Sequence, residues 1–170
     1  MSRRSRSREV ALQVLFQDDL NPCDPHGDAF PFLKQRLNAD DLLNFSVELI
    51  DGVRQHQSEL DSLLENLAKH WSVSRMATAD RNILRLAAFE MLFLKTPHRI
   101  AMDEAIELAK RFGSSQSSQF INGILDRVWQ EKGTPESNPA EQHLTENNPE
   151  NQESGSAPSK NTQTNSDRST

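Results

Sequence analysis

The chain has 170 residues, of which 35% are hydrophobic and 26% charged, and its 19 basic and 25 acidic residues give a formal charge of -6. Its single cysteine, Cys23, cannot form an internal disulfide, which excludes a disulfide-stapled secreted scaffold and fits the reducing cytoplasm. No uninterrupted apolar stretch approaches the roughly 18 residues that a membrane-spanning helix needs, so we expect no such helix.

The composition divides the chain into two segments. Residues 133–170 hold only three residues of the hydrophobic class, Ala140, Leu144 and Ala157. This segment cannot bury enough apolar surface to offset the entropy lost on ordering, so we predict a disordered, acidic, polar tail. Without the tail's six acids and two bases, residues 1–132 carry 17 bases and 19 acids, and they are long enough for one helical domain with one core.

Helical apolar spacing recurs along this domain in chain order. The segments that have it cover about residues 7–19, 30–37, 40–53, 58–71, 78–96, 102–112 and 117–128. Pro22 and Pro97 end the first and the fifth segment, and the polar residues 54–58 separate the third from the fourth. Alternating β-branched runs bounded by turn signals do not occur. The pattern predicts an all-α fold, a compact helical bundle of about seven helices.

Helix-end signals support these boundaries. Ser58, Thr78 and Ser117 are predicted N-caps, because a side-chain oxygen there can accept a hydrogen bond from a free N–H of the first turn. Gly113 follows the sixth segment, where a glycine commonly ends a helix. Gly123 lies within the last segment, and we expect it to leave room for the backbone of a neighbouring helix.

The chain offers few residues for catalysis. It contains no GxSxG, P-loop, GxGxxG or HExxH motif, and its five histidines are scattered singly, so we expect no enzymatic activity. Cys23, Asp24, His26 and Asp28 could ligate a metal, but no second Cys or His pair stands at a matched spacing. We therefore expect a plain loop there, without a metal or a cofactor.

Glu90 falls near the apolar stripe of the fifth segment. A buried carboxylate can act as a general acid, but no second catalytic partner accompanies this one. We favour a structural ion pair of Glu90 with Arg81, with Arg85 or with a base on a neighbouring helix.

Two features could contact RNA. Arg3, Arg4, Arg6 and Arg8 precede the first acid of the chain, and guanidinium groups match phosphate geometry and stack on bases. They suit an RNA-binding arm that orders on contact, and a solvated, frayed terminus explains them equally well. Phe120 opens the last helix, where an aromatic ring could stack on a base, although its spacing favours a place in the core. Because the whole chain is acidic, any RNA contact must be local.

Four stretches together resemble the NusB family of transcription antitermination factors. They are residues 8–17 (REVALQVLFQ), 80–85 (DRNILR) with Glu90 after them, 103–110 (DEAIELAK) and 120–126 (FINGILD). The likeness runs in the same order from about Arg3 to Trp129. It implies a compact all-α domain that has no catalytic activity and binds the boxA element of nascent ribosomal RNA transcripts as a single strand.

The resemblance also implies partners and site residues. Members of the family act with NusE, a small-subunit ribosomal protein, in a complex with other Nus factors on RNA polymerase. The residues that match the family's RNA contacts are Arg3, Arg4, Arg6, Arg8 and Phe120. Phe16 and Asp80 match the NusE interface, although the family pattern has Tyr where Phe16 stands, so a phenolic hydrogen bond is absent here.

Two alternatives stay open beside this interpretation. A protein-only helical adaptor would bind its partner without RNA. The helical domain is also similar to the front domain of ribosomal RNA cytosine methyltransferases, which need a long α/β domain where this sequence has a 38-residue polar tail. The sequence leaves open the preferred RNA, the role of the tail and whether the free protein forms a homodimer.

Overall fold

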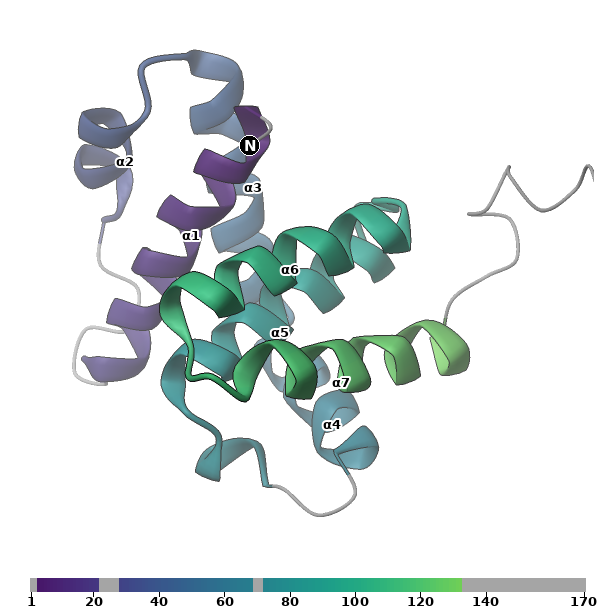
Figure 1. Ribbon diagram of the computed structural model, residues 1–170. Helices are drawn as coiled ribbons and strands as arrows, with labels where there is room; N and C mark the ends of the chain where they lie inside the picture. The colour runs from purple at the N-terminus through teal and green to yellow at the C-terminus, as the bar shows by residue number, and fades with distance from the viewer. Residues whose placement is uncertain (1–2, 22–27, 69–71, 133–170) are drawn as a thin grey trace, which may run out of the picture. The chain divides into compact units, whose positions relative to one another are not determined.

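The computed structural model describes residues 3–21, 28–68 and 72–132. The predicted tail, residues 133–170, lies outside the described residues, as do Cys23, Asp24 and His26 of the connector. Within the described ranges the chain forms seven α-helices, one short 3-10 helix and no strand (Figure 1). The predicted all-α fold is therefore confirmed.

The helices match the predicted segments one to one. They are α1 (Arg3–Leu20), α2 (Phe30–Arg36), α3 (Asp40–Gln55), α4 (Gln57–Leu67), η1 (Val73–Arg75, the 3-10 helix), α5 (Thr78–Leu92), α6 (His98–Phe112) and α7 (Ser117–Lys132). The break predicted at residues 54–58 falls at His56, between α3 and α4. Both α1 and α6 begin about one turn earlier than their apolar spacing indicates.

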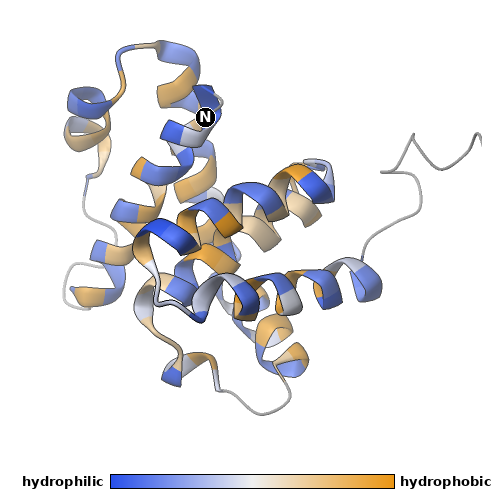
Figure 2. Cartoon of the chain, viewed as in Figure 1, coloured by the Kyte–Doolittle hydropathy of each residue, from blue (hydrophilic) through white to orange (hydrophobic). Residues whose placement is uncertain are grey.

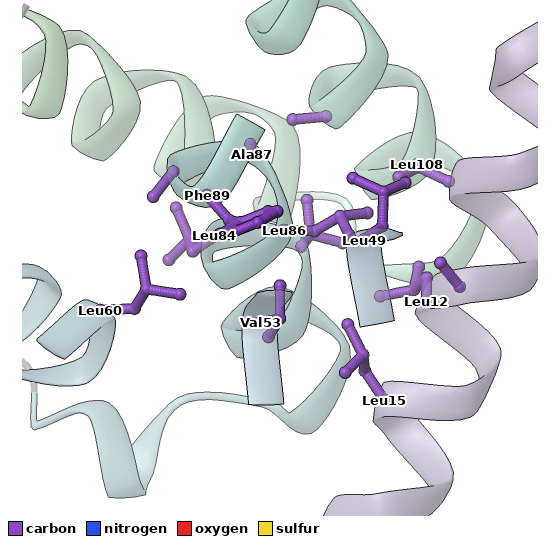
Figure 3. Packing of buried hydrophobic residues seen from close by; sticks show 14 of the residues in the cluster. Leu12, Leu15, Leu49, Val53, Leu60, Leu84, Leu86, Ala87, Phe89 and Leu108 are labelled. Carbon is purple, nitrogen blue, oxygen red and sulfur yellow. The ribbon is translucent and has the colours of Figure 1, made fainter. Parts of the chain in front are cut away.

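Helix α5 forms the centre of the core. It packs against α1, α3, α4, α6 and α7 (Figure 1), and every residue from Asn82 to Met91 is buried. A helix that is buried all round must have apolar neighbours on every side. Figure 3 shows these neighbours around Leu84, Leu86 and Phe89 of α5: Leu12 and Leu15 of α1, Leu49 and Val53 of α3, Leu60 of α4 and Leu108 of α6.

Helices α1 and α3 run side by side, and small residues at their contact let them approach closely. The Ser7 hydroxyl donates to the Leu42 carbonyl at 2.9 Å, and the Ser46 hydroxyl donates to the Ser7 carbonyl at 3.1 Å. Ser5 and Ser7 are both buried. In the added first turn of α1, the Ser5 hydroxyl donates to Glu104 of α6 at 2.7 Å, and apolar spacing could not reveal such contacts because it counts no serine.

The predicted role of Gly123 is wrong. A Cβ atom at Gly123 would meet no other atom within 4 Å, and the residue is exposed. The close approach occurs instead at Gly52 of α3, where an added Cβ would overlap the ring of Phe89 in α5. The glycine between packed helices is thus the one that faces the central helix.

The three predicted N-caps are also wrong. Helix α4 begins at Gln57, before Ser58, and α5 begins at Thr78 itself, and neither start has a side-chain cap hydrogen bond. Ser117 does sit at the start of α7, but its hydroxyl accepts from the Ser114 N–H of the preceding turn, at 2.8 Å.

Candidate nucleic-acid interface

The four N-terminal arginines lie on the first two turns of α1. Figure 2 shows that this part of the helix is hydrophilic. The prediction of an arm that orders only on contact with RNA is wrong. The chain is helical from Arg3 onward, and α3 forms hydrogen bonds with Ser7 of this helix. Helical geometry turns the four side chains in different directions, so each has its own surroundings.

Arg8 is buried, with 4% of its surface exposed. Its Nε and Nη2 atoms donate to the two carboxylate oxygens of Glu90 at 2.8 and 2.6 Å, and Glu104 lies 3.7 Å from Nη1. Burial by itself would lower the pKa of Arg8, but the hydrogen bonds and charge of Glu90 outweigh it and the pKa is raised. The predicted ion pair of Glu90 is confirmed, and its base comes from a neighbouring helix.

Arg3 and Arg6 each pair with one carboxylate, and only the partner of Arg3 is exposed. Arg3 donates to Asp41 of α3 at 3.4 Å, in a pair that is largely exposed. Arg6 donates at 2.7 Å to the buried Glu9, which also accepts from Arg111 of α6 at 2.6 Å. The exposed pair of Arg3 and Asp41 contributes little to stability, so Arg3 can exchange the carboxylate for a phosphate.

Arg4 differs from the other three arginines. Its guanidinium carbon lies 4.7 Å from the ring centroid of Phe45, which α3 holds in the core at 7% exposure. Within the described part of the chain, Arg4 has no carboxylate partner and its side chain is exposed. The cation–π contact therefore fixes its position while its N–H donors remain available.

Phe120 lies in the first turn of α7, half-buried against the hydrophobic core. Its backbone N–H donates to the Gln116 carbonyl at 3.1 Å, which fixes the start of the helix. The structure places Phe120 on a different helix from the arginines, so an RNA that contacts both must pass from α1 to α7.

Phe16 lies on the wall of a groove of about 1010 Å³. Its apolar lining includes Leu12, Phe16, Leu20, Phe32 and Phe112, which come from α1, α6 and the segment at α2. Leu20 is 55% exposed, which is unusual for a residue of its size. An open groove with this lining is suited to an apolar segment of another protein.

Asp80 lies in the first turn of α5, next to Ala79, which lines the same groove. It is 9% exposed, and its Oδ1 atom has no hydrogen-bond partner among the described residues. Its place near a helix N-terminus stabilises the negative charge. Phe16 and Ala79, the neighbour of Asp80, thus line the same groove, whereas Asp80 itself is not among the lining residues.

An acidic residue that the sequence did not single out, Asp19, ties this region together. Its carboxylate accepts from Arg81 at 2.8 and 2.9 Å, from Asn82 at 2.9 Å and from Arg85 at 3.1 and 3.2 Å. Arg85 also donates to both oxygens of Asp61 in α4, at 2.6 and 2.7 Å. The position of Asp19 could have indicated this network from the sequence. An acid in the last turn of a helix interacts unfavourably with the helix dipole, so nearby basic residues are expected to compensate its charge.

The charge of Asp19 is stabilised by these neighbours. Burial would raise the pKa of its carboxyl, but the hydrogen bonds and charges of Arg81, Arg85 and Asn82 outweigh it and hold the pKa below its ordinary value. The network fixes the end of α1 against α4 and α5. It thereby holds Phe16 and Asp80 in place.

No group of three potential metal ligands occurs in the part of the chain that the structure describes. In the same ranges, no helix has both the length and the apolar character that crossing a bilayer would require.

Comparison with known proteins identifies the family. The model of the NusB family matches residues 5–130. The transcription antitermination protein NusB of Bdellovibrio bacteriovorus is 39% identical over 130 residues, which cover 75% of this chain and 96% of that protein. NusB of Desulfosudis oleivorans is 41% identical over 156 residues, covering 88% of this chain and the whole relative, 100%.

Solved structures agree with this assignment. NusB of T. maritima superimposes with a TM-score of 0.72 and 34% identity, covering 81% of this chain and 97% of that one. A crystal structure of the antitermination factors NusB and NusE in complex with double-stranded RNA superimposes with a TM-score of 0.65 and 27% identity, covering 77% of this chain and 99% of that one. The chain belongs to the NusB family.

Proposed function

We propose that this protein is a cytoplasmic transcription antitermination factor without enzymatic activity. It binds a boxA-type sequence in nascent ribosomal RNA together with NusE and promotes processive transcription, acting on RNA polymerase through the assembled Nus factors. The observation that carries the RNA part is Arg4, an exposed arginine held on Phe45 without a carboxylate partner in the described ranges. A guanidinium presented in this way is prepared for a phosphate.

The RNA surface follows the exposed side of α1. Arg3, Arg4 and Arg6 contact phosphates directly, and Phe120 stacks on an unpaired base. Arg8 is a positioning residue in this proposal, since both edges of its guanidinium are engaged by Glu90 and Glu104 in the interior. Its direct RNA contact, which the family resemblance implied, has little support from this geometry.

The partner surface is the groove beside Phe16. An apolar segment of NusE fills it, and a donor from NusE satisfies the buried Oδ1 atom of Asp80. A buried acceptor without a partner carries a desolvation penalty of about 1 to 3 kcal/mol, which complex formation would remove. Phenylalanine at position 16 supports apolar packing in this groove and no side-chain hydrogen bond.

Fluorescence anisotropy tests the proposal with labelled boxA-like, scrambled and duplex RNA, each titrated with the protein alone and with NusE. We expect preference for single-stranded boxA-like RNA, strengthened by NusE. The variant Arg4→Glu should weaken RNA binding and retain NusE binding. The variant Phe16→Ala should weaken NusE binding, whereas Phe30→Ala, an exposed phenylalanine on α2 outside the groove lining, should leave it unchanged.

The second candidate is the protein-only adaptor, and one observation favours it. Three of the four N-terminal arginines already have carboxylate partners, which reduces the charge available to RNA. If NusE binds normally and no RNA binds under any condition, the adaptor is the correct function.

A further inference from the structure

We propose that the groove between α1 and α3 is a subsite for one unpaired nucleobase that carries an exocyclic amino group. The base stacks on the guanidinium of Arg4, and Asn44 and Glu48 of α3 read its edge. This subsite rests on the proposed RNA-binding function and adds a base-selective contact to it.

The floor of the subsite is a cation–π pair. Arg4 lies 4.7 Å from the ring centroid of Phe45, and Arg8 lies 5.3 Å from the same ring. Because Phe45 is buried and Arg8 is fixed by Glu90, the ring cannot move away from Arg4. Unpaired RNA bases stack on the planes of arginine guanidinium groups as well as on aromatic rings. The exposed side of Arg4 therefore offers a base a plane whose position is already fixed.

A hollow of suitable size adjoins this plane. It has a volume of about 440 Å³ and is lined by Arg4, Asp41, Asn44, Phe45, Val47 and Glu48. Small-molecule sites in proteins have volumes of about 300 to 1,000 Å³, so one base fits while a folded helix of RNA does not. Phe45 and Val47 supply apolar walls, and the other four residues supply polar groups.

Two polar groups of the hollow, those of Asn44 and Glu48, are available to read a base. Asn44 and Glu48 stand four residues apart and hence on one face of α3. Both are exposed, and neither has a hydrogen-bond or ion-pair partner within residues 3–21, 28–68 and 72–132. A carboxylate accepts from the exocyclic amino group of a base, and an asparagine amide can both accept and donate at a base edge. Uracil would place a carbonyl oxygen against Glu48 and lacks the amino donor.

The charges also orient the strand. Asp41 and Glu48 repel phosphate, whereas Arg4 on the other wall of the hollow attracts it. The sugar–phosphate backbone therefore follows α1, and the base turns toward α3. This separation of charge distinguishes a base subsite from a second phosphate site.

A uracil scan tests the subsite. Each amino-bearing base of the boxA-like RNA is replaced by uracil, one at a time, and the affinity for the full chain is measured by anisotropy. At the base that enters the hollow, we expect uracil to weaken binding about tenfold, from the loss of roughly 1.4 kcal/mol of edge contacts. In Glu48→Gln, which can donate to the uracil carbonyl, that difference should shrink to less than about threefold at this position alone.

Matched variants separate this effect from general charge and from folding. Asp51→Asn removes the same charge from an exposed position one turn further along α3. Arg4→Lys keeps the positive charge and removes the planar guanidinium group. It should therefore weaken the binding of intact RNA about tenfold. The binding of an RNA with an abasic nucleotide at that position should hardly change.

The results distinguish the two proposals. The base subsite is overturned if Glu48→Gln changes the affinity for every RNA equally, or if it changes the affinity only as much as Asp51→Asn does. In both cases the proposed RNA-binding function is retained. If the unmodified protein binds no RNA, alone or with NusE, the subsite falls together with the proposed function.

Discussion

Four arginines within six positions of α1 have four different environments. Arg8 is an interior group, Arg3 pairs with the exposed Asp41, Arg6 pairs with the buried Glu9, and Arg4 lies on an aromatic ring. The sequence shows the cluster but cannot assign the carboxylates, because Asp41, Glu90 and Glu104 come from distant parts of the chain. Counting basic residues therefore overestimates the charge available to RNA.

The buried pair of Arg8 and Glu90 makes the strongest prediction at this scale. In Glu90→Ala the guanidinium stays buried without its main counter-charge, so the free energy of unfolding should fall by about 3 to 5 kcal/mol. The control is Glu107→Ala, which breaks the exposed 2.6 Å pair with Lys110 and should change stability by less than about 1 kcal/mol. Urea unfolding measures both variants, and equal losses would contradict the structural role of the buried pair.

At the scale of helices, the contact between α3 and α5 depends on one glycine. Gly52 allows the ring of Phe89 to lie against the backbone of α3, and that ring also stacks on Phe93 with a centroid distance of 5.4 Å. Phe89 is buried and packed on all sides, so it cannot yield to an added methyl group.

The two helical glycines should therefore respond oppositely to alanine. Gly52→Ala should destabilise the protein by about 1 to 3 kcal/mol, since it overpacks the core. Gly123→Ala should stabilise it by about 0.5 to 1 kcal/mol, because the exposed site has room and alanine favours the helix. Thermal unfolding of the two variants checks the opposite signs, and destabilisation of similar size in both would show that the helix crossing is wrongly understood.

The end of α1 makes a pH-dependent contribution to stability. Asp19 has a lowered pKa in the folded protein, so its charge stabilises the fold above the unfolded pKa of about 3.9, and this contribution is lost as pH falls through the folded value. Asp19→Asn should therefore lose stability at neutral pH and show a smaller further loss between pH of about 5 and 2. Urea unfolding at several pH values measures this, with the exposed Asp103→Asn as control. Parallel pH curves for Asp19→Asn and the unmodified protein would rule out the stabilising role.

At the scale of the whole molecule, the sequence predicts the order and number of helices well. Apolar spacing depends on local geometry, and each stripe found in the sequence faces the core that α5 organises. It could not predict the early start of α1 or the exchange of roles between Gly52 and Gly123, because both depend on contacts between helices. For the candidate site, the arginine cluster was visible in the charge pattern and the pair Phe16 and Asp80 came from family resemblance, whereas Phe45, Asn44 and Asp19 required the fold.

The predicted division at residue 132 concerns the molecule as a whole. The described core is built from residues up to Val128, so a chain that ends at Lys132 should unfold cooperatively with an unchanged midpoint. Calorimetry of the two chains compares them directly. Loss of the cooperative transition in the shorter chain would show that residues 133–170 are part of the folded domain.

The most direct test of the account is the salt dependence of RNA binding. If Arg3, Arg4 and Arg6 each neutralise one phosphate, the slope of log K against log salt should be about -2 for single-stranded boxA-like RNA. Arg4→Ala should reduce its magnitude by about 0.7. Arg75→Ala, which removes an exposed arginine from η1, should leave it unchanged. A slope near zero, or equal slopes for Arg4→Ala and the unmodified protein, would contradict the claim that α1 presents an RNA-binding surface.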